Sequence, residues 1–224
     1  MPDMPVTVRL RKPAMVIFDV GETLIDETGI WHRIAARFGI PPFTVSAVAG
    51  IALTRGLGFR EILEELARFS DLPVETWRSP DLLDVGLDDL YPDVVPAFGN
   101  LQSGGIKIGI CGNQPQSTED VLSRLPINID WMSSSARLNL RKPDPAFFNA
   151  LIDQTGIDAQ DILYVGDRLD NDIYPAIRHG MQASWLLRGP WAFAQWHENR
   201  DVPDIHISRS LNGLANHLIN DLID

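Results

Sequence analysis

Two carboxylates in this chain stand where buried strands are expected to end, and both could do covalent or metal chemistry. Asp19 follows an apolar run at residues 15–18, and Asp167 follows another at residues 162–165. Such runs are typical of central parallel strands, and open α/β sheets bind their ligands outside the carboxyl ends of these strands. Asp19 is therefore a candidate nucleophile or metal ligand. The alternative is that it caps a turn in which Gly21 supplies a positive φ.

Further polar residues are expected at the same edge of the sheet. Asn113 follows another apolar run, Lys142 lies just before a predicted helix, and Asp172 comes shortly after the later strand. Because parallel strands put their carboxyl ends along one edge, we expect these side chains to converge with Asp19 and Asp167. The result would be an acidic pocket with one cation, which a divalent ion would stabilise. Hard oxygen ligands favour magnesium.

The elements that must position these residues alternate between strand and helix after residue 92. This alternation predicts an α/β fold, with a Rossmann-like core of three layers in which helices cover both faces of a parallel sheet. The predicted strands are residues 15–18, 106–111, 129–132, 162–165 and 183–187, with a short edge strand at 204–207, and helices are predicted at 145–154 and 211–222.

The segment between the first strand and the rest of the core has a different pattern. Apolar residues recur at helical spacing in residues 30–38 and again in residues 62–69. Glycine and proline interrupt the pattern between these stretches. We therefore expect a helical cap domain at residues 25–92, inserted into a core domain formed by residues 1–24 and 93–224.

Composition narrows the classes of partner. The 224 residues are 45% hydrophobic, and the formal net charge of −11 argues against a nucleic acid or an anionic membrane as the main partner. No run approaches the roughly 18 apolar residues of a membrane span, and the first residues do not resemble a secretory signal. The single cysteine, Cys111, excludes an intramolecular disulfide and a cysteine-based zinc site. The expected location is the cytoplasm.

The order and spacing of these motifs resemble the haloacid dehalogenase superfamily, in the subgroup that inserts a helical cap directly after the first motif. The third motif, Lys142 in the sequence RKPDP, and the fourth, at residues 165–172, match well. The first and second motifs are altered. Gly21 stands where the first motif usually has a second acid, and Gly112 stands where the second motif usually has a hydroxyl residue.

The resemblance implies a mechanism and a metal site. Asp19 would attack phosphorus and form an aspartyl phosphate, which water then hydrolyses. The magnesium ligands would be Asp19, Asp167 and the backbone carbonyl of Gly21, with Asp172 mostly in the outer shell.

The resemblance also implies roles around the nucleophile. Lys142 would balance the charge of the nucleophile and the phosphate, and Asn113 would help to position the phosphoryl oxygens. Backbone amides near Gly112 could partly replace the missing hydroxyl. Trp31 and Arg33 lie early in the cap, where relatives contact their substrates. The alternative for the arginine is a solvated position on a helix face.

Because position 21 is a glycine, the chain lacks the second acid of the first motif, which would protonate the leaving oxygen. General acid–base assistance is commonly worth about 10²- to 10⁴-fold in rate. An active enzyme would therefore prefer acyl or aryl phosphates, or recruit another acid such as Glu22 or a cap residue. Asp26 and His32 are further candidates, although the propensities of such residues favour a helix-start role and a surface role instead.

The function that this sequence favours is a magnesium-dependent phosphatase acting on a small phosphorylated metabolite. The runner-up is a catalytically weakened relative that binds a ligand or partner, which the glycines at positions 21 and 112 would explain. Metal-free dehalogenation is a third hypothesis, disfavoured because Asp167 and Asp172 suit a metal. The sequence does not specify the substrate or the oligomeric state.

Overall fold

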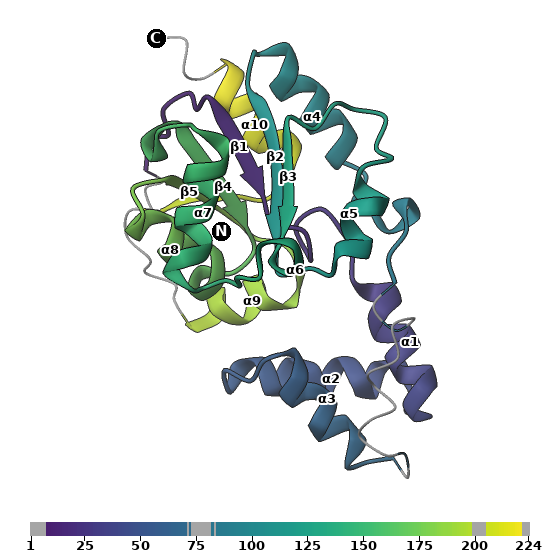
Figure 1. Cartoon of the computed structure of the whole chain (residues 1–224). Coiled ribbons are helices and arrows are strands. Elements are labelled where there is room, and N and C mark those ends of the chain that lie inside the picture. The colour runs from purple at the N-terminus through teal and green to yellow at the C-terminus, as the bar shows by residue number, and fades with distance from the viewer. Residues whose placement is uncertain (1–7, 71, 73–81, 83, 199–204, 221–224) are drawn as a thin grey trace.

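The computed structural model describes residues 8–70, 72, 82, 84–198 and 205–220. Among these residues the core of the molecule is one parallel sheet in the order β3-β2-β1-β4-β5-β6, with β1 in the middle (Figure 1). The strands are β1 (Met15–Phe18), β2 (Lys107–Gly112), β3 (Trp131–Ser134), β4 (Ile162–Gly166), β5 (Gln182–Leu186) and β6 (His206–Ser208).

The central strand β1 is buried on both faces because its side chains alternate between two apolar clusters. Val16 and Phe18 face one cluster, in which Phe18 packs on Phe98 with ring centroids 4.8 Å apart. Met15 and Ile17 face the other cluster. The first cluster contains residues of α4 (Val94–Ser103), α5 (Gln116–Leu122) and α10 (Leu211–Asn220), and the second is flanked by α6 (Ser135–Leu138), α7 (Pro145–Thr155), α8 (Tyr174–Arg178) and α9 (Gly189–Glu198).

The predicted α/β fold is confirmed, and each strand lies within two residues of its predicted bounds; the edge strand, for example, starts at His206. The strand expected at residues 129–132 begins two residues later, at Trp131. The reason is Asp130, whose carboxylate accepts the N–H of Ile108 at 2.8 Å, so that the side chain takes the place of a ladder carbonyl. Residue 204 of the predicted edge strand and residues 221–222 of the predicted closing helix lie outside the described residues.

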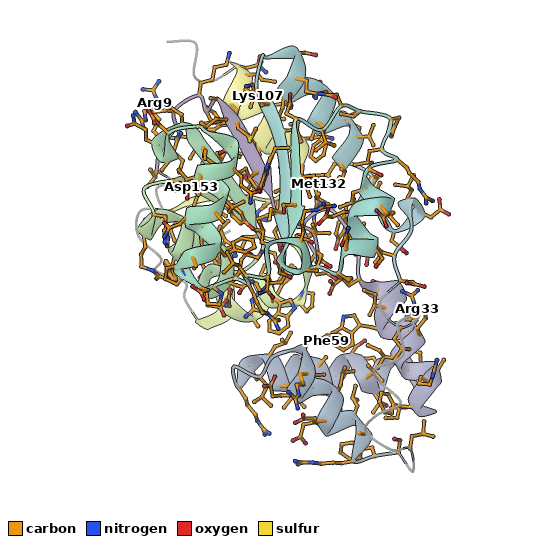
Figure 2. All side chains as sticks on the ribbon, in the orientation of Figure 1. Arg9, Arg33, Phe59, Lys107, Met132 and Asp153 are labelled. Atoms are coloured by element: carbon orange, nitrogen blue, oxygen red, sulfur yellow. The ribbon has the colours of Figure 1, made fainter. Side chains whose placement is uncertain are left out.

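The cap consists of helices that stand apart from the sheet (Figure 1). They are α1 (Thr28–Phe38), α2 (Pro42–Thr54) and α3 (Phe59–Ala67), which share their own cluster of buried apolar residues. Figure 2 shows Phe59 on the side of the cap that faces the core. Helix α1 ends at Gly39, whose φ of 65° lies in the left-handed region that glycine adopts without strain.

Two chain segments join the cap to the core, and they lie side by side. Ile25 and Leu90 form an antiparallel bridge, and the N–H of Tyr91 donates to the carbonyl of Leu24 at 2.9 Å. The 3-10 helix η3 (Leu87–Asp89) leads into the second segment. The cap boundaries expected at residues 25 and 92 stay predictions, but the paired segments lie close to both.

Helix α9 of the core contacts the cap. It packs against α2, and its residues Trp191 and Ala194 lie against the apolar cluster of the cap. Gln195 on the same helix accepts the N–H of Leu169 at 2.7 Å. Since Leu169 begins the helix η5 (Leu169–Ile173) that carries Asp172, α9 connects the cap with the loop after β4.

Within the described residues, no helix is by itself long and apolar enough to cross a membrane, although α1 and α2, bent by 111°, meet that criterion as a pair. The remaining short helix, η4 (Ala159–Asp161), precedes β4.

Candidate active site at the carboxyl edge of the sheet

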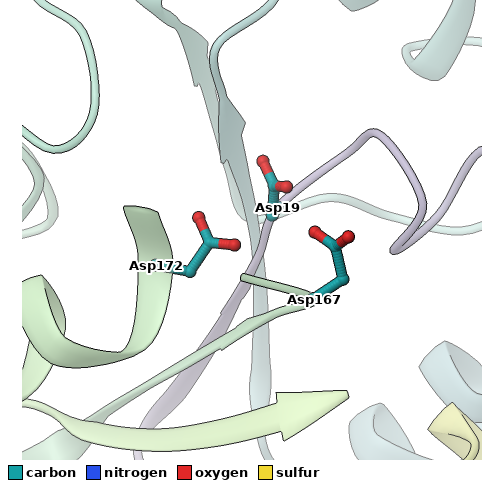
Figure 3. Close-up of side chains that lie close together, drawn as sticks. All are labelled: Asp19, Asp167 and Asp172. Carbon is teal, nitrogen blue, oxygen red and sulfur yellow. The ribbon is translucent and has the colours of Figure 1, made fainter. Parts of the chain in front are cut away.

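Three buried aspartates meet at the carboxyl edge of the sheet. Asp19 follows β1 and Asp167 follows β4, and the N–H of Asp19 donates to the carbonyl of Val165 at 2.8 Å. Asp172 reaches the same place from η5, and ligand oxygens of all three carboxylates lie within 4.8 Å of one another (Figure 3). The three aspartates therefore converge at the carboxyl edge of the parallel sheet, as the sequence predicted.

Lys142 is the cation of this cluster. Its Nζ lies 2.6 Å from Asp19 Oδ1 and 2.5 Å from Asp172 Oδ1, and the residue is only 4% exposed. The ring of Tyr164 lies beneath the ammonium, with 5.5 Å between Nζ and the ring centroid. Burial alone would lower the pKa of Lys142, but Asp172 and Asp19 raise it well above its usual value. Lys142 is therefore an ammonium that offsets the negative charge of the carboxylates it contacts.

Asp172 uses both of its carboxylate oxygens within the protein. Besides the contact with Lys142, its Oδ2 accepts the N–H of Arg168 at 3.0 Å. The side chain lies flat against Gly166, where an added Cβ would be 2.4 Å from Oδ2. Asp172 is thus held in place chiefly to position the lysine, and glycine at position 166 makes the necessary room.

The cluster carries more negative charge than one lysine balances. Burial, followed by the charges of Asp172 and Asp19, raises the pKa of Asp167 well above its usual value. Burial also raises the pKa of Asp172, to about 6. Asp167 Oδ2 is buried and has no hydrogen-bond partner in the described part of the chain. Hard carboxylate oxygens, excess negative charge and an oxygen without a partner together fit a magnesium ion.

Asn113 is committed to the backbone of Lys142. Its Nδ2 donates to the carbonyl of Lys142 at 3.0 Å, and its Oδ1 accepts the N–H of the same residue at 2.9 Å. The Asn113 amide therefore holds the backbone of Lys142 next to the end of β2. The phosphoryl contact expected for Asn113 stays a prediction, and the structure gives this residue a positioning task.

Gly112 makes room for the nucleophile candidate. A Cβ built on Gly112 would lie 2.4 Å from Asp19 Oδ1, a distance that real side chains do not adopt. Any larger residue would force the Asp19 carboxylate to move. Gly112 therefore leaves space for the Asp19 carboxylate, besides lacking the hydroxyl that the second motif usually has at this position. Cys111, one residue earlier, is buried, and burial raises the pKa of its thiol.

Gly21 adjoins the carboxyl group of Glu27, which lies six residues further along the chain. A Cβ built on Gly21 would lie 2.3 Å from Glu27 Oε1 and 3.5 Å from Gln114 Nε2. Burial, followed by the charges of Glu22 and Asp19, raises the pKa of Glu27 to about 8. Nothing in the sequence singles out Glu27, because a glutamate is an ordinary residue at a helix start.

The three residues considered as replacements for the missing general acid have other positions or contacts in the structure. Glu22 is buried, and its carboxylate accepts the Tyr91 hydroxyl at 2.6 Å and the N–H of Glu27 at 3.1 Å. Asp26 accepts a backbone N–H at the start of α1 at 2.9 Å. His32 is exposed on α1. These positions agree with the structural alternatives for Asp26 and His32.

The two cap residues expected to contact substrate lie on α1. Trp31 packs edge-on against Phe59, with ring centroids 5.3 Å apart. The guanidinium of Arg33 donates to the backbone carbonyls of Leu82 and Asp84, and Figure 2 shows Arg33 on α1. Arg33 therefore ties α1 to the segment that returns to the core. Substrate contact by Trp31 or Arg33 stays a prediction.

Comparison with known proteins identifies the family. A family model for the haloacid dehalogenase-like hydrolases matches residues 14–180, a range that includes Asp19, Lys142, Asp167 and Asp172. The chain belongs to this family. The predicted family and the assignment as a hydrolase are thereby confirmed.

Named relatives in this family are phosphatases. The chain is 33% identical to the glyceraldehyde 3-phosphate phosphatase of Methanopyrus kandleri over 122 residues, which are 53% of this chain and 52% of that enzyme. This chain thus spans about half the length of that relative. It is 26% identical to phosphoglycolate phosphatase 1 of Pseudomonas aeruginosa over 202 residues, which are 80% of this chain and 71% of that enzyme.

Solved structures share the fold. The HAD-hydrolase YfnB of Bacillus subtilis, in a form bound to magnesium, superposes with a TM-score of 0.69 at 20% identity. The match covers 95% of this chain and 99% of that one. This likeness shows that the two proteins share the fold over nearly the whole chain.

Proposed function

We propose that this hydrolase is a magnesium-dependent phosphatase that acts on a small phosphorylated metabolite through Asp19. The observation that carries the proposal is the buried contact of 2.6 Å between Asp19 Oδ1 and Lys142 Nζ at the carboxyl edge of the sheet. The ammonium offsets the negative charge of the Asp19 carboxylate, whose oxygen can act as a nucleophile.

The chain's own residues then account for the reaction. An oxygen of Asp19 bonds to phosphorus while the bond from phosphorus to the bridging oxygen breaks, which leaves an aspartyl phosphate. Water hydrolyses this intermediate and restores the carboxylate. Lys142 offsets the negative charge that Asp19 and the phosphoryl group bring together, while Asn113 and Asp172 hold Lys142 in place.

The magnesium ion of the proposal fits the acidic cluster. Asp19 and Asp167 would hold it, together with the Gly21 carbonyl that the family resemblance implies. Asp172 has both oxygens engaged, which suits an outer position. When bound, the ion would neutralise charge on the phosphoryl oxygens and orient the substrate.

The substrate class comes from the named relatives. Their names specify glyceraldehyde 3-phosphate and phosphoglycolate, which are small and carry one phosphate. We therefore propose metabolites of this size as the first candidates for this chain. A cytoplasmic location and the lack of a nucleic-acid or membrane partner remain predictions from composition.

A second candidate function is ligand or partner binding without appreciable turnover. The observation that favours it is the glycine at position 21, since the usual acid is missing there. Dehalogenation without a metal is the least favoured reading, because the cluster of Asp19, Asp167 and Asp172 suits a cation.

The test is turnover with magnesium on acetyl phosphate, p-nitrophenyl phosphate, phosphoglycolate and glyceraldehyde 3-phosphate. The Asp19→Asn variant should lose activity on every substrate, by a factor on the order of 10⁴ or more, as expected when a nucleophile is removed. The matched control is Asp153→Asn, which changes an exposed aspartate on α7 (Figure 2) and should keep full activity. A native protein that binds magnesium but turns over none of these substrates would favour the binding function instead.

A further inference from the structure

We propose that Glu27 is a catalytic residue of this enzyme, whose carboxyl group replaces the acid missing at position 21 and protonates the leaving oxygen. The inference rests on the proposed phosphatase function. It concerns a residue from the start of the cap, six positions after the glycine in the first motif.

The first argument is the space that the carboxyl group fills. The Cβ of any side chain at position 21 would begin 2.3 Å from Glu27 Oε1. The Glu27 carboxyl therefore occupies the volume that an acid at position 21 would use. The amide of Gln114, from the loop after β2, comes within 3.5 Å of the same point. Glu27, six positions later, and Gln114, from a distant segment, thus supply polar groups where the first motif supplies none.

The second argument is the direction in which Glu27 points. Glu27 is the N-cap residue of α1, a position at which short polar side chains commonly accept an N–H of the first helical turn. Its side chain makes no such bond, and Asp26 accepts the N–H of Thr28 instead. Its orientation toward Gly21 is therefore not explained by helix capping.

The third argument is the difference between Glu27 and its neighbours. Glu22 is held through both oxygens by Tyr91 and by the backbone of Glu27. In the described ranges of the chain, the Glu27 carboxyl has no hydrogen-bond or ion-pair partner. The Glu27 carboxyl beside Gly21 can therefore meet a substrate oxygen, whereas the Glu22 carboxylate is engaged within the protein.

The proton transfer balances with the phosphatase reaction. As Asp19 bonds to phosphorus, the electron pair of the breaking bond goes to the bridging oxygen. That oxygen takes the proton of the Glu27 carboxyl and leaves as an alcohol. The Glu27 carboxylate then takes a proton from the water that hydrolyses the aspartyl phosphate, which restores the acid.

The experiment compares Glu27→Gln with the native protein on substrates whose leaving groups differ. Acetyl phosphate releases acetate, which needs no proton, whereas glycerol 3-phosphate releases an alkoxide unless an acid assists. We expect kcat/KM on glycerol 3-phosphate to fall by about 10²- to 10⁴-fold, and on acetyl phosphate by less than about 10-fold. The control Asp26→Asn removes a carboxylate from the same turn and should change neither value appreciably.

A rescue variant tests the shared space directly. Glu27→Ala should lose the same activity on glycerol 3-phosphate, and adding Gly21→Asp to it should restore at least 10-fold, on the order of one acid's contribution. Gly21→Asp alone should gain less, because Glu27 still fills the volume. Retained turnover of acetyl phosphate shows that each variant is folded.

The outcomes separate this inference from the proposed function. An equal loss on both substrates in Glu27→Gln, or no rescue by Gly21→Asp, would overturn the role of Glu27 and leave the phosphatase assignment intact. A native protein without Asp19-dependent turnover of acetyl phosphate would overturn both.

Discussion

The two sides of the candidate active site hold their acidic side chains differently. On the β4 side, formed by Lys142 and residues 167–172, Asp172 is fixed by the lysine ammonium and by the backbone of Arg168. On the turn side, formed by residues 21–27, Glu22 is fixed by Tyr91 but the Glu27 carboxyl points at a glycine. The β4 side keeps the residues of its motif. The turn side lacks the acid that its motif usually has at position 21, but the carboxyl group of Glu27 lies in the space beside that position.

This difference teaches that a motif and the chemistry it stands for are separate properties. A charged cluster such as the β4 side depends on several mutual contacts, so replacing one member leaves the others buried without compensation. A proton donor needs only to reach one oxygen atom, so a different segment can supply it. The predictions below probe this contrast through stability and metal binding.

The largest effect on stability is expected from Lys142→Met, which removes the cation of the β4 side. The carboxylates of Asp19 and Asp172 would lose their buried partner, and such a loss typically costs about 3–5 kcal/mol. Urea unfolding measures it, with Lys107→Met as the control. Lys107 is exposed at the opposite end of the sheet (Figure 2). Equal stabilities of the two variants would contradict the view that the β4 side depends on mutual compensation.

A smaller effect is expected from magnesium itself. A ligand that binds only the folded state at 100 times its Kd stabilises by about 2.7 kcal/mol, which thermal unfolding would detect as a higher Tm. Asp167→Asn should abolish this response because it alters the oxygen that has no protein partner. Asp170→Asn is the matched control, since Asp170 pairs with Arg168 and lies outside the cluster. A response that survives in Asp167→Asn would place the ion elsewhere.

The smallest effect is expected on the turn side, from Tyr91→Phe. Loss of the hydroxyl leaves a buried oxygen of Glu22 without its donor, which should cost about 1.5 kcal/mol in unfolding free energy. The ratio of kcat/KM between acetyl phosphate and glycerol 3-phosphate should not change, because Glu22 has a structural task. Tyr174→Phe, at a partly exposed tyrosine, is the control. A changed ratio would mean that Glu22 also takes part in proton transfer.

Much of the fold and the β4 side could be predicted from the sequence because local pattern and topology agree there. A continuously apolar run has to be buried on both faces, and parallel strands align their carboxyl ends. Asp19, Asp167 and Asp172 were therefore expected to meet, and the structure places their oxygens within 4.8 Å of one another. The start of β3 was misplaced by two residues, because a side-chain hydrogen bond of Asp130 carries no signal in an apolar pattern.

The turn side was decided by the tertiary structure. The sequence determined that position 21 lacks an acid, and it offered Glu22, Asp26 and His32 as substitutes without distinguishing their directions. Only the folded turn reveals that Glu22 is engaged and that Glu27 reaches the space beside Gly21. The physical reason is that periodicity reports which residues are buried in regular elements, whereas the direction of a side chain in an irregular turn depends on contacts between segments distant in sequence.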